Sequence, residues 1–304
     1  MKKVLVISYS QSGQLSQFVK SATEPLSQSD DIQVDHHILE PVTPYPYPWT
    51  FYSFFDAFPE AIYMNGCDLK PAPHLAEDYD LIIIGYTVWF LAPSIPITGF
   101  LKTDQAKRLL QDKPVVTLIA CRDMWVMAQE KMKSLIDDCG GHLIDNAVLT
   151  DQSGTIYSFV TTPRWMLTGK KDAFGIFPAA GVSEKDIAES ARFGERLASG
   201  LSQNLEKERK PLLTNLNAVK VNGKLVGSEK IATRSFMIWG KLIQRSGKPG
   251  DFSRKVVITI YVIFLMTMIF TLVPINLLAK KLISPLMKKS IEKSTEYYEK
   301  PSGR

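Results

Sequence analysis

The sequence predicts an α/β protein with a doubly wound, five-stranded parallel sheet, two long loop insertions and a C-terminal transmembrane helix. Three observations predict it. Apolar runs of strand length alternate with helical patterns over roughly the first 200 residues, two proline-rich and aromatic-rich stretches interrupt this alternation, and a long uncharged run lies near the C-terminus. A strand that is buried on both faces of a parallel sheet is apolar along its whole length.

Five runs are expected to be strands: Lys3–Tyr9, Ile32–Leu39, Asp80–Tyr86, Pro114–Cys121 and Leu143–Leu149. Four segments between and after them have helical spacing: Ser12–Leu26, Pro96–Leu110, Met124–Cys139 and Ser183–Leu201. Ser183 followed by Asp186 is a variant of the capping box that begins a helix. Strands that alternate with helices favour a parallel sheet with helices on both faces.

The charge of the chain is divided unevenly. The whole chain has a net charge of +5, but residues 1–204 carry −7 and residues 205–304 carry +12. Such asymmetry points to nucleic acid or a membrane surface as the partner of the basic half. The three cysteines form no CxxC pair and the four histidines lack metal-ligand spacing, so we expect neither a disulfide framework nor a metal site.

The uncharged run Val256–Ala279 favours the membrane over nucleic acid. It has 24 residues, and Arg254 and Lys255 precede it while Lys280 and Lys281 follow it. As a helix it would be about 36 Å long, against a hydrocarbon core of about 30 Å. A buried core helix remains the alternative. The expected organisation is a catalytic domain at 1–204, a basic and partly amphipathic juxtamembrane segment at 205–255, a transmembrane helix at 256–279 and a basic tail at 280–304.

The N-terminus bears on localisation. After Met1 and two lysines, only a short apolar stretch follows, without a cleavage-like site, so we expect no signal peptide. The catalytic domain is therefore expected in the cytoplasm, on a protein that crosses the membrane once near its C-terminus. Membrane lipid is the expected partner of the basic half, and nucleic acid is not.

The chemistry is expected where the strands end, because ligands of open parallel sheets bind at the carboxyl ends of the strands. The first such loop contains Ser10, Gln11, Ser12, Gly13, Gln14 and Leu15. Hydroxyl groups and a glycine at a helix N-terminus can hold a phosphate through backbone N–H groups and O–H donors. The loop lacks the lysine of a nucleoside triphosphate P-loop and the three glycines of a dinucleotide site. A solvated turn is the alternative reading.

Two further strand ends carry aromatic and charged side chains. The loop after the third strand contains Thr87, Val88, Trp89 and Phe90, and the loop after the fourth contains Cys121, Arg122, Asp123 and Trp125. Simpler interpretations stay open for several of them. Trp89 and Phe90 are compatible with core packing, Cys121 with a small buried residue, and Arg122 and Asp123 with a surface ion pair.

The three loops together resemble the flavodoxin-like family in their order and spacing, over residues 1–150 and 183–204. The resemblance implies FMN as cofactor, with its phosphate in the loop at 10–15 and its ring between Thr87–Phe90 and Arg122–Trp125. It also implies that Arg122, if it faces the ring, stabilises a reduced anionic flavin. Gln14-Leu15 departs from the family, which commonly has a second threonine or serine near the phosphate.

The two insertions, 41–73 and 155–182, are expected to be functional loops because of their length. The first, with the Thr-Pro-Arg-Trp segment at 162–165, resembles a bacterial group found with dialkylresorcinol and aryl-polyene biosynthesis and often labelled dialkylresorcinol condensing enzyme. Condensation of acyl chains needs a nucleophilic cysteine with histidine partners, which the sequence does not show. The resemblance implies an aromatising oxidoreductase instead. The residues expected to roof an apolar substrate pocket are Tyr45, Tyr47, Trp49, Phe51, Phe54, Phe55 and Trp165.

The function that the sequence supports is a membrane-anchored, FMN-dependent oxidoreductase. Its substrate would be a lipophilic cyclic molecule, quinone-like or an alkyl cyclohexenone, and its redox partner is not identified by the sequence. No residue is assigned as catalytic acid or base, since the flavin itself carries the hydride. Two alternatives are a membrane-tethered flavodoxin-like electron carrier and a flavin-free membrane interaction module.

Overall fold

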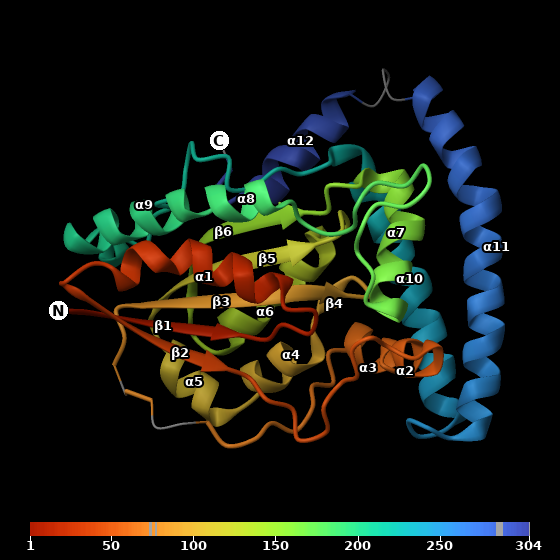
Figure 1. The fold of residues 1–304 in the computed structure, drawn as a ribbon, viewed down its shortest axis with the longest axis horizontal. Helices are drawn as coiled ribbons and strands as arrows, with labels where there is room; N and C mark the ends of the chain where they lie inside the picture. Colours follow the sequence, from red (N-terminus) through yellow and green to blue (C-terminus); the bar gives the residue numbers. More distant parts are fainter. Residues whose placement is uncertain (73–74, 77, 284–287, 304) are drawn as a thin grey trace.

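A computed structural model describes residues 1–72, 75–76, 78–283 and 288–303. Its centre is a mixed sheet of six strands, β1 (Lys2–Ser8), β2 (Ile32–Ile38), β3 (Leu81–Trp89), β4 (Ala92–Pro93), β5 (Pro114–Cys121) and β6 (His142–Thr150). Five strands run parallel in the order β2-β1-β3-β5-β6 (Figure 1). Counted without β4, this is the order 2-1-3-4-5 of flavodoxin-like proteins.

The predicted number of strands needs one correction. Five parallel strands are present, but the sheet has a sixth, because β4 folds back on β3 as a two-residue antiparallel strand. Phe90 and Leu91 form the tight connection with positive φ values of 50° and 60°. Proline at position 93 is tolerated because this short strand lies at an edge. The hairpin was not predicted, since two residues give no hydrophobic period.

Helices cover both faces of the sheet (Figure 1). One layer contains α1 (Gln14–Ser27), α8 (Glu184–Glu189) and α9 (Ala191–Ser202), and the other contains α4 (Ile95–Leu101), α5 (Asp104–Leu110) and α6 (Val126–Asp138). The main core lies between these layers and includes the fully buried side chains of Leu5, Ile7, Phe18, Phe100 and Phe193. A short 3-10 helix, η1 (Leu205–Glu208), follows α9.

Two of the expected helices are each divided into two. The segment expected at 96–110 ends at Leu101 and begins again at Asp104, because the Thr103 side chain accepts a hydrogen bond from the Ala106 N–H and caps a new helix. The segment at 183–201 is divided at Ser190. The expected cap at its start is confirmed: the Ser183 hydroxyl oxygen accepts from the Asp186 N–H at 3.0 Å.

Both insertions contain helices, although long loops were predicted there from the sequence. The first holds α2 (Phe51–Asp56) and α3 (Phe58–Ile62), and the second holds α7 (Gly154–Thr168). Pro163 lies inside α7. Proline and clustered aromatic residues obscured the helical period in both segments.

Three helices form the C-terminal part: α10 (Gly223–Ser246), α11 (Phe252–Ile283) and α12 (Lys288–Glu299). In the described part of the chain, one helical segment, Phe252–Thr271 in α11, is long and apolar enough to cross a membrane, with a mean hydropathy of 1.8. The expected span at 256–279 lies within α11. Residues 284–287 and 304 of the expected tail lie outside the described residues. The rest of the tail forms α12 and a final segment that returns to β6.

Candidate functional site

The first strand-end loop joins β1 to α1. Gly13 is the N-cap residue of α1, with φ of 81°, and no side chain caps this helix. A Cβ atom added at Gly13 would meet nothing within 4 Å. The Ser10 hydroxyl is buried and has no hydrogen-bond partner among the described residues. Uncapped backbone N–H groups and a free hydroxyl at a helix N-terminus are the donors that a phosphate accepts from.

The other residues predicted for this loop are either next to Gly13 or already bonded or buried within the protein. Ser12 is half-buried beside Gly13. Gln11 donates from Nε2 to the Pro46 carbonyl at 2.6 Å. The Gln14 side chain accepts from the Val182 N–H at 2.9 Å and donates to the Val182 carbonyl at 3.1 Å, and Leu15 is fully buried in the core. Gln14 therefore fastens the second insertion to this loop.

The second predicted loop is largely the end of β3: Thr87, Val88 and Trp89 are strand residues because β3 extends to pair with β4, and Phe90 lies in the turn. Ser8 of β1 pairs in register with Gly85 of β3, so Ser10 and Thr87 lie two residues further along neighbouring strands, at the same edge. The Thr87 hydroxyl is also buried without a partner among the described residues. Two buried, unpaired hydroxyl groups at one edge leave hydrogen-bonding capacity for a ligand, since such groups are rarely left unsatisfied.

Trp89 lies at the centre of an aromatic cluster over this edge. Its ring centroid is 5.0 Å from that of Tyr45, 5.4 Å from Trp49 and 6.0 Å from Tyr9, all edge to face. Val88 and Phe90 belong to the β3–β4 hairpin, and Phe90 packs on Phe54 and Phe58. Burial raises the pKa of Tyr9 to about 12 and also raises that of Tyr45, so both phenols stay protonated near neutral pH.

The third loop follows β5 and is held by α7. Arg122 donates from Nε to the Ser158 hydroxyl at 2.6 Å, and its guanidinium lies 4.0 Å from the Phe159 ring centroid. Asp123 accepts from the Thr155 hydroxyl. Burial lowers the pKa of Arg122 and raises that of the Cys121 thiol. Arg122 and Asp123 therefore contact the second insertion instead of pairing with each other on the surface. Trp125 is fully buried in the core.

The two insertions meet over the same edge of the sheet. The Trp49 N–H donates to the Met166 carbonyl of α7 at 2.8 Å. Trp165 is buried beside Gly181, where an added Cβ would lie 3.0 Å from the Trp165 ring and 2.7 Å from the Gln14 amide. Together with the Gln11 bond to Pro46 and the Gln14 bonds to Val182, these contacts join the first strand-end loop to both insertions.

The predicted substrate-pocket residues form two groups. Tyr45, Trp49 and Phe54 lie with Trp89 and Phe90, next to the strand ends. Phe55 packs toward the C-terminal part, with its ring 6.3 Å from that of Tyr261, and Phe51 is exposed beside it. Tyr47 is half-buried and precedes a cis proline.

Sequence reasoning missed a polar network under α7. Asp151 accepts from the Ser153 hydroxyl at 2.6 Å and from the Gly181 N–H at 2.8 Å, and the Ser153 and Thr161 hydroxyl oxygens lie 3.0 Å apart. The available signal was positional: Asp151 follows directly after β6, at the fourth strand end of the same edge.

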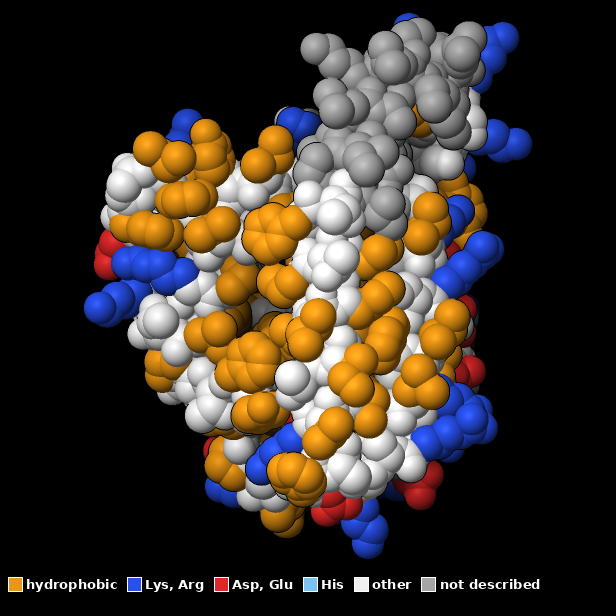
Figure 2. Space-filling model, turned by 90° about the vertical axis from the view of Figure 1, so that its right-hand side faces the viewer, with side chains coloured by type: hydrophobic (Ala, Val, Ile, Leu, Met, Phe, Trp, Pro, Cys, Tyr) orange, Lys and Arg blue, Asp and Glu red, His pale blue; other side chains and the backbone are white. Residues whose placement is uncertain are grey.

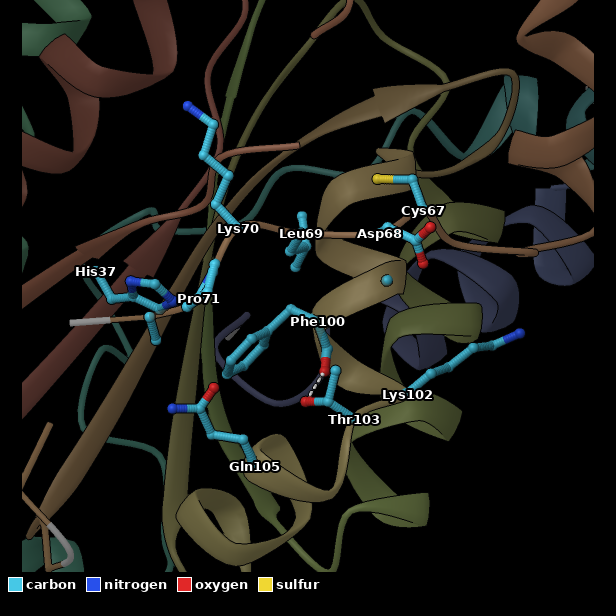
Figure 3. Close-up of a pocket in the computed structure, with 12 residues that line it drawn as sticks. His37, Cys67, Asp68, Leu69, Lys70, Pro71, Phe100, Lys102, Thr103 and Gln105 are labelled. Carbon is cyan, nitrogen blue, oxygen red and sulfur yellow. Dashed lines mark hydrogen bonds between the residues drawn. The ribbon is translucent and has the colours of Figure 1, made fainter. Parts of the chain in front are cut away.

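A separate cleft of about 540 Å³ lies beside α4 (Figure 3). Figure 3 shows His37 of β2 and Phe100, Lys102, Thr103 and Gln105 around it. His37 is buried, its Nδ1 has no partner among the described residues, and burial lowers its pKa, which favours the neutral ring. None of the three strand-end loops contributes to this lining.

No protein-family model matches the chain, and no curated protein matches it. Among solved structures, it is similar to a flavoprotein in complex with FMN from Lactobacillus acidophilus NCFM, with 22% identity over 49% of this chain and 93% of that chain and a TM-score of 0.39. It is also similar to a flavodoxin from the domain Archaea, with 12% identity over 66% and 99% of the two chains and a TM-score of 0.37. It is similar as well to a flavone reductase, with 13% identity over 66% of this chain and 63% of that chain and a TM-score of 0.36.

Proposed function

We propose that this protein is an FMN-dependent oxidoreductase whose cofactor lies at the carboxyl edge of β1, β3 and β5. The observation that carries the proposal is the pair of buried, unpartnered hydroxyls of Ser10 and Thr87 beside the uncapped N-terminus of α1. These donors fit a phosphate monoester, which is dianionic near neutral pH. No acidic residue lies in the first turn of α1, so nothing there repels an anion.

Each loop would have a separate task. Ser10, Ser12 and the N–H groups after Gly13 would hold the phosphate, and Trp89 with Tyr9 would provide apolar ring surface for the isoalloxazine. Bound FMN supplies hydride transfer at its N5 position. The protein orients the cofactor and excludes water, and the aromatic cluster with α7 serves that purpose. The guanidinium of Arg122 already donates to the Ser158 hydroxyl and the Thr155 carbonyl of α7. Arg122 would therefore have to break these bonds before it could reach the flavin.

The test is a charge substitution at the phosphate position. Gly13→Asp should lower FMN affinity at least 100-fold, because its carboxylate would face the phosphate. Gly13→Asn is the matched control, since both residues tolerate positive φ and have the same shape. Fluorescence titration of the apoproteins with FMN measures both. Equal affinities for the two variants would place the phosphate elsewhere. A wild-type protein that binds no FMN would exclude the proposed function and favour the flavin-free interaction module.

A lipophilic cyclic substrate, quinone-like or an alkyl cyclohexenone, is part of the proposal. Two features support it: aromatic side chains line the strand ends, and the helix that covers them, α7, has Ile156, Tyr157 and Val160 exposed on its outer side. The aromatising role in dialkylresorcinol or aryl-polyene biosynthesis rests on the sequence resemblance alone. Turnover of a substrate series of increasing alkyl length checks this part. We expect kcat/KM to rise with chain length, and a flat series would exclude a lipophilic substrate.

The electron-carrier alternative is less favoured by the geometry. A carrier needs an exposed flavin edge to reach its partner, whereas here the insertions 41–73 and 155–182 close over the strand ends through the Trp49–Met166 and Gln14–Val182 contacts. The redox partner that would reduce or oxidise the flavin stays unassigned.

We also propose that α11 attaches the protein to a membrane, with the flavin domain on the cytoplasmic side. Only 17% of the apolar segment within Phe252–Thr271 is buried, which supports a membrane helix over a core helix. Its composition suits a single span, as the sequence predicts, and equally an orientation along the membrane surface.

A further inference from the structure

The first two turns of α7 are polar inside and apolar outside. The buried side chains of the helix are Ser158, Thr161 and Trp165, and the two hydroxyl residues bond to Arg122 and Ser153 below them. Its exposed side chains are Ile156, Tyr157 and Val160, with 66%, 44% and 43% of their surface accessible. A surface helix in water has the opposite arrangement, with its apolar stripe toward the core. This inversion indicates that the outer side of α7 meets an apolar medium.

The helix α11 is apolar on both sides. Ile258, Tyr261 and Val262 pack into the cluster formed with α2, α3 and α10, and the Tyr261 ring stacks on Phe58 at 4.7 Å. The opposite side carries an exposed stripe at helical spacing: Phe252, Val256, Ile260, Ile263, Met266 and Phe270. A helix that is hydrophobic all round needs a non-aqueous environment on its outer side as well.

The outer sides of α7 and α11 lie on one face of the molecule. Both helices are at the same end in Figure 1, and Figure 2 looks directly at this end, where hydrophobic side chains spread over the surface and charged ones lie toward its margins. The exposed apolar residues Ile156, Tyr157, Val160, Val256, Ile260, Ile263, Met266 and Phe270 are here called the lipid-facing surface. It exceeds the scattered apolar residues normal for a soluble surface.

The start of α11 and the segment after α12 are both tied to the domain that contains the sheet. Near the start of α11, Arg254 is 1% exposed and bonds to Asp56 at 2.5 Å and to Glu60 at 2.6 Å. Beyond its end, Ser302 donates to the Asp145 carboxylate of β6 at 2.7 Å. A bilayer crossing would place the tail about 30 Å from the domain, across the hydrocarbon core, and would break that last contact.

We infer that α11 lies along the membrane surface instead of crossing it, and that α7 is immersed beside it in the same leaflet. The partner is a bilayer with anionic lipid. Amphipathic and apolar segments of this kind insert about 5–10 Å, into the region between headgroups and acyl chains. Exposed basic residues next to the lipid-facing surface, such as Lys170, Lys248 and Lys255, complement anionic headgroups.

The inference deepens the proposed membrane association, and the position of the tail tests it. The full chain with Glu296→Cys on the exposed side of α12 is expressed in bacteria, and inverted membrane vesicles are treated with a membrane-impermeant maleimide. Lys20→Cys on α1 is the reference for the cytoplasmic side, and the unsubstituted chain gives the background of the native cysteines. We expect Glu296→Cys to label as fully as Lys20→Cys without detergent. Labelling that requires detergent would show a crossing and overturn the surface orientation, while leaving membrane association and flavin binding intact.

A second experiment tests the part of α7. Ile156→Glu combined with Val160→Glu should weaken co-sedimentation with vesicles of phosphatidylcholine and phosphatidylglycerol at least tenfold. Val42→Glu, an exposed apolar site in the first insertion, should change it less than twofold. Near-UV circular dichroism and FMN content confirm that the variants fold. Unchanged binding of the α7 variant would remove α7 from the surface. A wild-type protein that ignores vesicles and forms a dimer without detergent would show that a second copy covers this face.

Discussion

The helices α1 and α7 have nearly the same length, 14 and 15 residues, but their apolar side chains face in different directions. α1 packs Leu15, Phe18 and Val19 against a face of the sheet and turns polar residues outward. α7 lies over the strand ends, buries Ser158 and Thr161 together with Trp165, and turns Ile156, Tyr157 and Val160 outward. The outer sides of the two helices therefore suit different surroundings.

The contrast extends to the whole end of the molecule built from α7, α10 and α11. Ionisable groups are withdrawn from solvent there: Arg122 is half-buried under α7, and Glu229 on α10 and Arg254 on α11 are buried. Glu229 accepts from the Met127 N–H at the start of α6 at 2.6 Å. Around α1 the buried side chains are apolar, apart from Gln14 and Thr23. Burial of apolar area therefore holds α1, whereas directed polar contacts fix α7 and α11 at particular points.

The largest effect expected from this contrast is at Arg254. Arg254→Ala should lower the free energy of unfolding by about 3–5 kcal/mol, because it leaves Asp56 and Glu60 without their buried partner. Lys248→Ala, at an exposed position four residues before α11, should cost less than about 0.5 kcal/mol. Urea unfolding in mild detergent, followed by circular dichroism, measures both. A small loss for Arg254→Ala would mean that apolar packing alone holds α11.

Glu229 should make stability depend on pH. Burial raises its pKa from 4.5 to about 7, with a smaller contribution from the charge of Asp123. Between these values the folded protein binds a proton that the unfolded chain has released, so stability is full below pH 4.5 and falls as pH rises toward 7. The loss amounts to about 3 kcal/mol.

The matched variants isolate this carboxyl. Glu229→Gln keeps an oxygen for the Met127 N–H and cannot ionise, so unfolding free energies measured at pH 5 and pH 7.5 should differ by about 2–2.5 kcal/mol less than in the wild type. Glu24→Gln, at an exposed site on α1, should follow the wild type. Parallel curves for Glu229→Gln and the wild type would show that Glu229 is ionised in the folded protein.

The sheet could be predicted from the sequence because its strands are apolar throughout. The runs at 114–121 and 32–39 agree with β5 and β2 to within one residue. The position of the first strand-end loop could also be predicted, since a glycine and several serines lie between a buried strand and a helix. The sequence did not predict the helix α7. Its apolar stripe faces outward and Pro163 lies inside it, so the usual pattern of a helix that packs on a core was missing.

The partners of the predicted site residues could not be read from the sequence either. Gln14 to Val182 and Arg122 to Ser158 join segments far apart in the chain. The aromatic insertion shows the same limit. Its composition indicates packing, but only the fold reveals that Phe54 lies with Phe90 at the strand ends while Phe55 turns toward Tyr261. Composition predicts that a side chain is buried, but it does not identify the residues against which that side chain packs.

The smallest expected effect compares one substitution in the two helices. Thr161→Val in α7 should cost about 1–2 kcal/mol, because it removes one of the two side-chain partners of the Ser153 hydroxyl in a buried network. Thr23→Val in α1 should cost less than about 0.5 kcal/mol, since that hydroxyl bonds only to the Val19 carbonyl of its own helix, at 2.8 Å, and valine fills the same space. Urea unfolding of the two variants gives the comparison. Thr161→Val should also loosen α7 over Arg122, which faster hydrogen exchange of the α7 amides would report. Equal costs, with unchanged exchange in α7, would mean that α7 is held by its apolar contacts as α1 is, and that its polar inner side is incidental to its position.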